Sequence, residues 1–229
     1  MLKRTILIAL FFLAGSYYAC AQFLSAVKTG VNICSLVPYE GAVDNHLGFS
    51  IGWEGEYDPL DWLGARFGLA ISQKGSGLRV PDSDFINHIP RTQLGYLLSP
   101  ASLVLKGRIH DFTVAIGGGL YYAYLISGNA DLVIDNLFGG GTSHFNVMKT
   151  EIIEYTSPSG ETHREMSLKR FNQTDYGGQV LLDLSYRSLS VGVSYQHGWK
   201  IITDQAPFVM MNGCHNECWS VHIGYYLKH

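Results

Sequence analysis

The sequence contains few charged side chains. Lys, Arg, Asp and Glu make up 15% of its 229 residues, against about 25% in ordinary soluble domains. Hydrophobic residues make up 47%, and this combination is unusual for a protein surrounded by water. The formal net charge is −3, which argues against nucleic acid as a main partner. The composition therefore favours a membrane environment.

Long hydrophobic runs are also missing. A membrane-spanning helix needs about 20 consecutive, mainly apolar residues, and beyond the N-terminus the chain has no run approaching that length. A bundle of spanning helices is therefore excluded. A transmembrane β-barrel remains, because only alternate residues of each strand face lipid and need to be apolar.

The N-terminal segment, residues 1–21, has the features of a secretory signal peptide. A basic start, an apolar core and a cleavage site of the A-x-A type follow one another at Lys3-Arg4, Thr5–Ala14 and Ala19-Cys20-Ala21. Cleavage after Ala21 would leave Gln22 as the first residue of a mature domain, 22–229. The alternative is a lipoprotein signal in which Cys20 carries the lipid.

Apolar residues alternate with small or polar residues along much of the chain, as in strands with one apolar face. The clearest case is the segment 189–200, whose apolar and aromatic members are Leu189, Val191, Val193, Tyr195 and Trp199. The pattern predicts eight strands, at 25–36, 45–57, 62–73, 92–106, 111–126, 172–187, 189–201 and 217–229. Each is long enough for the ~9–11 residues that a tilted transmembrane strand requires.

The predicted connections alternate in length. Short ones lie at 57–61, 107–110 and 187–188, and long ones at 37–44, 74–91, 127–171 and 202–216. Bacterial outer-membrane barrels have short periplasmic turns and long extracellular loops. We therefore predict an all-β fold, an antiparallel up-and-down transmembrane β-barrel of eight strands, located in the bacterial outer membrane.

The longest connection, 127–171, exceeds the usual length of a loop without secondary structure. A weak alternation on both sides of Ser157-Pro158-Ser159-Gly160 predicts a hairpin that stands beyond the membrane. If this segment joins the barrel instead, the barrel has ten strands.

Ionisable residues at inward positions are predicted to gather in the half of the lumen near the short turns. These residues are Lys28, Glu54, Glu56, Arg66, Asp183 and Arg187. The interior of an eight-stranded barrel is just wide enough for side chains to fill, and charges buried there need partners. We interpret the six residues as a structural cluster of salt bridges, with a gated ion or proton path as the alternative.

Cysteine is scarce. Cys214 and Cys218 lie close together in Cys-His-Asn-Glu-Cys, and in an exported protein this spacing predicts a local disulfide. Free thiols are one alternative, and a metal site that uses both thiolates and His215 is another. Cys34 is predicted to be a buried, inert thiol within a strand.

No group of residues with the character of a catalytic site is evident, since an enzyme needs a nucleophile, a base and an orienting group brought together. His46 and His222 are predicted to point inward and His197 outward, each as a structural or interfacial histidine. The chain is therefore predicted to be non-enzymatic, with no catalytic residue, no cofactor and no metal.

Three short motifs resemble those of a known family. They are Lys28-Thr29-Gly30-Val31-Asn32, Leu103-Val104-Leu105-Lys106-Gly107 and Asp175-Tyr176-Gly177-Gly178. In these motifs the chain is similar to the PorT-type outer-membrane β-barrel proteins of Bacteroidetes. The resemblance covers almost all of 22–229 and implies an outer-membrane barrel; one member of the family assists type IX protein secretion.

The function predicted from these observations is that of a non-enzymatic outer-membrane β-barrel protein. We expect it to contact outer-membrane lipid, and to act through extracellular loops on unidentified envelope or secretion proteins, as an accessory to secretion or envelope assembly. A narrow channel for small solutes is the alternative function, and an outer-membrane hydrolase is a further one.

Overall fold

The computed structural model describes residues 22–37, 42–79, 87–134, 141–155, 164–168, 171–203 and 213–227. Its strands are β1 (Gln22–Val37), β2 (Ala42–Leu60), β3 (Leu63–Arg79), β4 (Asn87–Ile109), β5 (Phe112–Ile134), β6 (Gly141–Asn146), β7 (Glu151–Tyr155), β8 (Arg164–Leu168), β9 (Thr174–Tyr186), β10 (Leu189–Gly198) and β11 (His215–Leu227). Within these ranges there is no helix long and apolar enough to cross a membrane. The predicted signal peptide, 1–21, lies outside the described residues.

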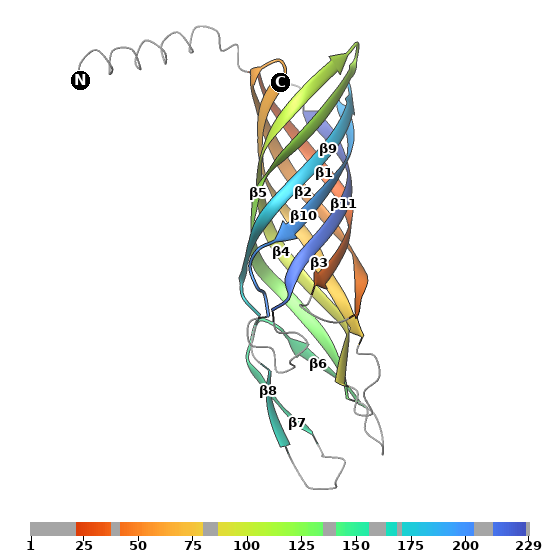
Figure 1. Cartoon of the computed structure of the whole chain (residues 1–229), viewed down its shortest axis with the longest axis vertical. Coiled ribbons are helices and arrows are strands. Elements are labelled where there is room, and N and C mark those ends of the chain that lie inside the picture. Colours follow the sequence, from red (N-terminus) through yellow and green to blue (C-terminus); the bar gives the residue numbers. More distant parts are fainter. Residues whose placement is uncertain are drawn as a thin grey trace, which may run out of the picture.

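Eight strands form a closed barrel (Figure 1). The strands follow one another around the barrel in the order β4-β3-β2-β1-β11-β10-β9-β5, and β4 also pairs with β5. Every pair is antiparallel, so the chain runs up and down. The predicted all-β barrel of eight strands is confirmed, and the ten-stranded alternative is wrong.

The segment of the ten-stranded alternative does not enter the barrel wall, and the lengths of β4 and β5 explain why. Each has 23 residues, whereas about 9–11 suffice to cross the bilayer, so both continue beyond it. The short strand β6 pairs only with this extension of β5, at Asn129–Ile134. The strands β7 and β8 pair with each other, and they form the predicted hairpin. Its predicted turn, 157–160, lies outside the described residues.

The two ends of the barrel differ. At one end, which we call the turn end, three pairs of strands are each joined by two residues, Asp61-Trp62, His110-Asp111 and Arg187-Ser188. His110 and Arg187 have positive φ values of 55° and 54°, which non-glycine residues adopt mainly in tight turns. The long connections lie at the opposite end, the loop end, and Figure 1 shows β6, β7 and β8 there.

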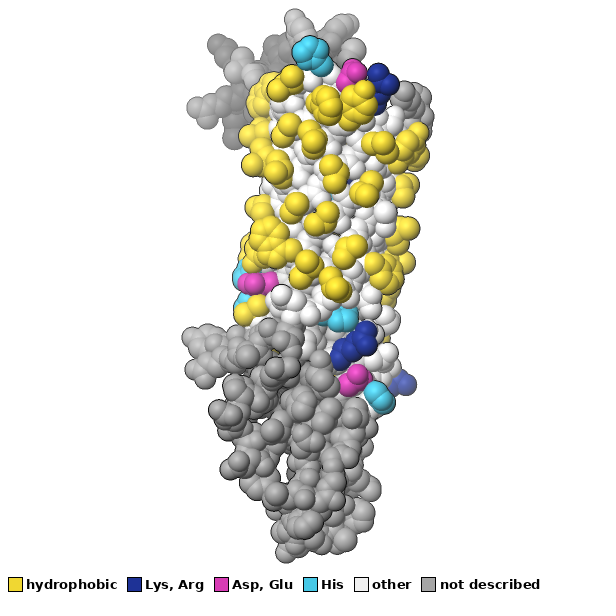
Figure 2. Space-filling view, turned by 90° about the vertical axis from the view of Figure 1, so that its right-hand side faces the viewer, with side chains coloured by type: hydrophobic (Ala, Val, Ile, Leu, Met, Phe, Trp, Pro, Cys, Tyr) yellow, Lys and Arg dark blue, Asp and Glu magenta, His cyan; other side chains and the backbone are white. Residues whose placement is uncertain are grey.

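The outer wall of the barrel is apolar along its height (Figure 2). Each of the eight strands exposes large hydrophobic side chains at outward positions, among them Val31, Phe49, Leu69, Leu103, Ile116, Leu182, Val191 and Ile223. Charged side chains visible in this view lie near the two ends of the wall. A wall of this kind is stable when lipid surrounds it, and its closure leaves no unpaired strand edge in the membrane.

Inside the barrel, glycine allows neighbouring strands to approach closely. A Cβ atom on the inward-facing Gly119 of β5 would collide with the backbone of Ala101 and Ser102 on β4. A Cβ atom on the outward-facing Gly118 would meet no atom nearer than 3.5 Å. The glycine-rich middle of β5 is therefore filled by the adjacent strand, and it does not leave an open bore.

A disulfide joins Cys34 on β1 to Cys218 on β11. The predicted Cys214–Cys218 disulfide is therefore wrong, and so are the free Cys34 thiol and the metal site that used both thiolates. The two residues of the bond stand directly opposite each other in the β1–β11 pairing, with Cα atoms 4.0 Å apart. Four residues of extended strand span about 13 Å, which is too far for a disulfide between Cys214 and Cys218.

Cys214 is free and buried. It precedes the first residue of β11, and its backbone amide donates to Thr203 Oγ1 at 3.2 Å. Burial raises the pKa of the Cys214 thiol, so the neutral and unreactive form predominates.

Peptide mapping without reduction should recover Cys34 and Cys218 in one cross-linked fragment. Cys34→Ser should lower the stability of the barrel by about 2–5 kcal/mol, because the bond restrains a long stretch of the unfolded chain. Cys214→Ser is the matched control, and it should leave both the cross-linked fragment and the response to reductant unchanged. Recovery of Cys218 linked to Cys214 would contradict this pairing.

Candidate functional site in the barrel lumen

Five of the six predicted charges meet inside the lumen near the turn end. Asp183 of β9 is fully buried; Lys28 Nζ lies 3.1 Å from its Oδ2 atom, and the Arg66 guanidinium pairs with the same oxygen. Arg66 Nε lies 2.6 Å from Glu56 Oε2. Lys28 Nζ lies 2.9 Å from Glu54 Oε1. Acids and bases from four strands therefore neutralise one another, as burial requires.

Three further residues belong to this group although the sequence reasoning did not assign them to it. Lys106 of β4 pairs with Glu56, and its Nζ atom lies 2.5 Å from Asp58 Oδ1. His222 Nε2 of β11 lies 2.7 Å from Asp183 Oδ1. The alternation of inward and outward positions along the strands could have identified all three. We call these residues the turn-end charge cluster: Lys28, Glu54, Glu56, Asp58, Arg66, Lys106, Asp183 and His222.

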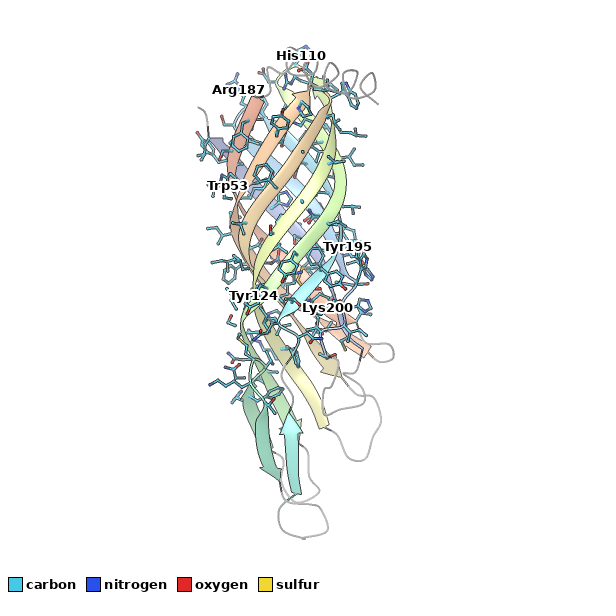
Figure 3. All side chains as sticks on the ribbon, turned by 90° about the vertical axis from the view of Figure 1, so that its left-hand side faces the viewer. Trp53, His110, Tyr124, Arg187, Tyr195 and Lys200 are labelled. Carbon is cyan, nitrogen blue, oxygen red and sulfur yellow. A yellow bond between two sulfur atoms is a disulfide. The ribbon has the colours of Figure 1, made fainter. Side chains whose placement is uncertain are left out.

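The prediction for Arg187 is wrong. Arg187 is not on a strand but in the turn between β9 and β10, and Figure 3 shows it at the turn end of the barrel. Its side chain is 69% exposed and pairs with Asp111 at 3.6 Å. The predicted strand, 172–187, extended one residue past the end of β9 at Tyr186, and a turn residue is not held by the inward alternation of a strand.

Uncharged polar side chains occupy the middle of the lumen. Asn32 Nδ2 donates to Ser72 Oγ at 3.1 Å, and Ser220 Oγ donates to Asn32 Oδ1 at 2.8 Å. Gln196 Nε2 donates to Gln179 Oε1 at 3.1 Å. These side chains line a cavity of about 110 Å³, which is polar enough to hold water.

A second charged group lies toward the loop end. Lys74 Nζ is 3.8 Å from Asp175 Oδ2, and both side chains are fully buried. Tyr121 and Asn216 donate to the same carboxylate oxygen, at 3.1 and 2.9 Å. The Lys74 ammonium also lies 4.5 Å from the centre of the Tyr121 ring and 5.6 Å from that of Tyr96, within the range of cation–π attraction. We call these five residues the loop-end polar cluster.

Apolar side chains cover the lumen at the loop end. The cover combines strand residues with Val147, Phe171, Ile202 and Cys214 from the connections, all buried in one hydrophobic cluster. Backbone hydrogen bonds tie these connections together: the Phe171 amide donates to the Val147 carbonyl and the Ile202 amide to the Cys214 carbonyl, each at 2.8 Å. The long connections therefore pack over the barrel in the part of the chain that the structure describes.

The lumen widens toward the turn end, where a recess of about 490 Å³ is present. Its lining is strongly charged and includes Arg66, Lys106 and Arg108. Arg66 is nearly buried and paired, so the turn-end charge cluster forms the floor of this recess. The recess can admit water and small ions from the turn end, and the paired charges obstruct their passage further along the axis.

The histidine–aspartate contact within the turn-end charge cluster does not form a hydrolytic triad of the usual kind. His222 is held by Asp183, but the neighbouring Ser220 donates its hydroxyl hydrogen to Asn32. The arrangement is that of a neutralised ion network, which stabilises the interior of the barrel.

No protein-family model and no curated protein sequence matches the chain, so membership of the PorT-type family stays an expectation. Among solved structures, the chain is similar to Ail, the attachment invasion locus protein of Yersinia pestis, with 14% identity over 90% of this chain and 99% of that one, and a TM-score of 0.43.

Two further solved structures show the same kind of likeness. Neisserial surface protein A has 15% identity over 90% of this chain and 97% of its own, with a TM-score of 0.41. OprG of Pseudomonas aeruginosa has 9% identity over 91% and 96%, also with a TM-score of 0.41. Likenesses this distant extend to the fold alone. The strand pairing and the apolar wall of the chain itself carry the conclusion that it is an eight-stranded β-barrel of the outer-membrane type.

Proposed function

We propose that this protein is a non-enzymatic outer-membrane barrel that acts through the structure at its loop end on a protein partner. The filled lumen is the observation that carries the proposal. Paired charges, a polar layer and an apolar cover follow one another along the axis. The barrel itself therefore serves as an anchor, and the parts of the chain free to contact a partner are those beyond the membrane.

The additional structure at the loop end supports this proposal. The strands β4 and β5 continue past the bilayer, β6 widens the extension of β5, and β7–β8 forms a separate hairpin. A barrel that only needed to span the membrane would not require these additions. By analogy with outer-membrane barrels in general, the loop end faces the outside of the cell. The finer proposal, an accessory role in secretion or envelope assembly, rests on the resemblance to the PorT-type proteins.

A channel for small solutes is the alternative, and the filled lumen argues against it. In planar bilayers the purified, refolded protein should show no stable single-channel steps, because conduction would strand buried charges without partners. Reproducible steps that vanish on denaturation would favour the channel.

The partner part of the proposal has its own test. Co-purification from native membranes should recover a protein with the intact barrel and lose it when Glu151–Leu168, from β7 to β8, is replaced by a short Gly-Ser linker. Heat-dependent migration on gels would show that the shortened barrel still folds. Equal recovery with both proteins would refute a role for the hairpin.

A further inference from the structure

Two histidines and a glutamate converge on the outside of the barrel at its loop end. Among the described residues, His197, His215 and Glu217 form the one group of at least three histidine, cysteine or acidic residues whose potential ligand atoms all lie within 4.8 Å of one another. His197 Nδ1 is 3.0 Å from Glu217 Oε1, and His215 Nε2 is 3.9 Å from the same oxygen. The two imidazole rings lie 4.9 Å apart, edge to face.

The backbone fixes this convergence. His197 on β10 stands directly opposite Glu217 on β11 in the antiparallel register. His215 precedes Glu217 by two residues on the same strand, so both point to the same face. The three side chains are therefore held by paired strands, which position ligands more accurately than loops do.

We propose that His197, His215 and Glu217 form a binding site for a divalent transition-metal ion, with Zn²⁺ as the fitting ion. Two imidazoles and one carboxylate are a common protein ligand set for zinc that leaves a fourth position for water. Ligand atoms around tetrahedral zinc lie about 3.3 Å apart, from metal–ligand bonds of about 2.0–2.1 Å. The distances from Glu217 Oε1 to His197 Nδ1 and His215 Nε2, 3.0 and 3.9 Å, lie on either side of that value. Rotation of the side chains can therefore bring the three ligand atoms into tetrahedral positions.

The surroundings suit an ion at this site. All three side chains are partly exposed, at 41%, 28% and 32%, so an ion can enter from the loop end. Tyr195 occupies the next outward position on β10, further from the loop end, beside the Glu217 carboxylate. Figure 3 shows Tyr195 in the loop-end half of the barrel.

This site differs from the cysteine-based alternative considered for the sequence. Cys218 faces the lumen and is bonded to Cys34, whereas His215 faces outward. The ion would join the last residues of β10 to the first residues of β11, and it would not contact the lumen clusters. Imidazole ligands select zinc, copper or nickel over calcium and magnesium.

Titration of the purified barrel in detergent with Zn²⁺ alone, free of any histidine tag, tests this site. We expect one ion per barrel and a rise in unfolding temperature with added zinc. His197→Ala, His215→Ala and Glu217→Gln should each weaken zinc binding by about 10-fold or more. Excess Mg²⁺ or Ca²⁺ should not compete.

Two matched controls keep the test specific. His144→Ala removes another exposed histidine that contacts a carboxylate, Asp131, at 2.6 Å but without a third ligand, and it should leave zinc binding unchanged. Cys214→Ser should also leave it unchanged, and a loss there would assign the ion to the thiol. Absence of saturable binding, or equal binding by wild type and a His215→Ala barrel that still folds on gels, would overturn the proposal.

Discussion

Arg66→Ala should lower the free energy of unfolding by about 3–5 kcal/mol, the cost of breaking a buried ion pair from one side. Arg66 pairs with both Glu56 and Asp183, and its side chain is only 4% exposed. Its removal leaves the Glu56 carboxylate with Lys106, and Asp183 with Lys28 and His222. Two lysines, Lys28 and Lys106, then face the four carboxylates of the turn-end charge cluster, so the acids are no longer neutralised. Urea titration in micelles, read by migration on gels, measures the loss.

Arg187→Ala is the matched control for this experiment. Arg187 is the same residue type near the same end of the barrel, but its contact with Asp111 is exposed on both sides. Exposed pairs contribute about 0–1 kcal/mol, so the unfolding transition should move little. Equal losses for the two variants would show that the turn-end charge cluster does not stabilise the barrel.

Asp175→Asn should have a comparably large effect at the other end of the lumen. Asparagine keeps the size of the side chain, but it removes the negative charge that faces the buried Lys74 ammonium at 3.8 Å. An uncompensated buried ammonium costs several kcal/mol. We therefore expect a loss of about 3–5 kcal/mol in the free energy of unfolding.

A second substitution separates this charge effect from a loss of hydrogen bonds. Lys74→Met added to Asp175→Asn removes the stranded ammonium and retains a chain of similar length, so the double variant should regain most of the stability. The donors Tyr121 and Asn216 are the same in both proteins. If the double variant is no more stable than Asp175→Asn alone, loss of the Lys74–Asp175 ion pair is not the cause of the lower free energy of unfolding.

The architecture could be predicted because it depends on local patterns. Alternation along each segment and the contrast between short and long connections were enough to identify all eight barrel strands. The same alternation placed five lumen charges correctly, from Lys28 on β1 to Asp183 on β9. Each of these signals is contained within one strand and its turns, so a single sequence reveals it.

Two of the errors lie where strand ends were misjudged, whereas Lys106 and His222 were missed inside predicted strands. Lys74 was assigned to a loop because the predicted third strand ended at residue 73, whereas β3 continues to Arg79. Its partner Asp175 then had no visible counter-ion. Arg187 was included because the predicted sixth strand extended one residue past the end of β9. A strand end is set by pairing with its neighbours, and local alternation does not contain that information.

The Cys34–Cys218 bond depends on a relation that sequence spacing does not contain. The two residues are 184 apart in the chain, and they meet only because the first and last barrel strands close the ring in one particular register. The proposed metal site on β10 and β11 depends on register in the same way, since His197 and Glu217 stand opposite each other. Short spacing along the chain favoured the wrong cysteine partner.

The position of the disulfide also determines how this barrel can open. The junction between β1 and β11 is the seam of the barrel, where the first and last barrel strands pair. At such a seam a barrel could open laterally, to exchange strands or to release a substrate into the bilayer. With Cys34 bonded to Cys218, the seam is covalently locked near the loop end. The pairs on the turn-end side of the bond, from Ser25 with Leu227 to Ile33 with Trp219, could separate while the bond stays intact. Lateral opening of the seam at the loop end would therefore first require a reductant.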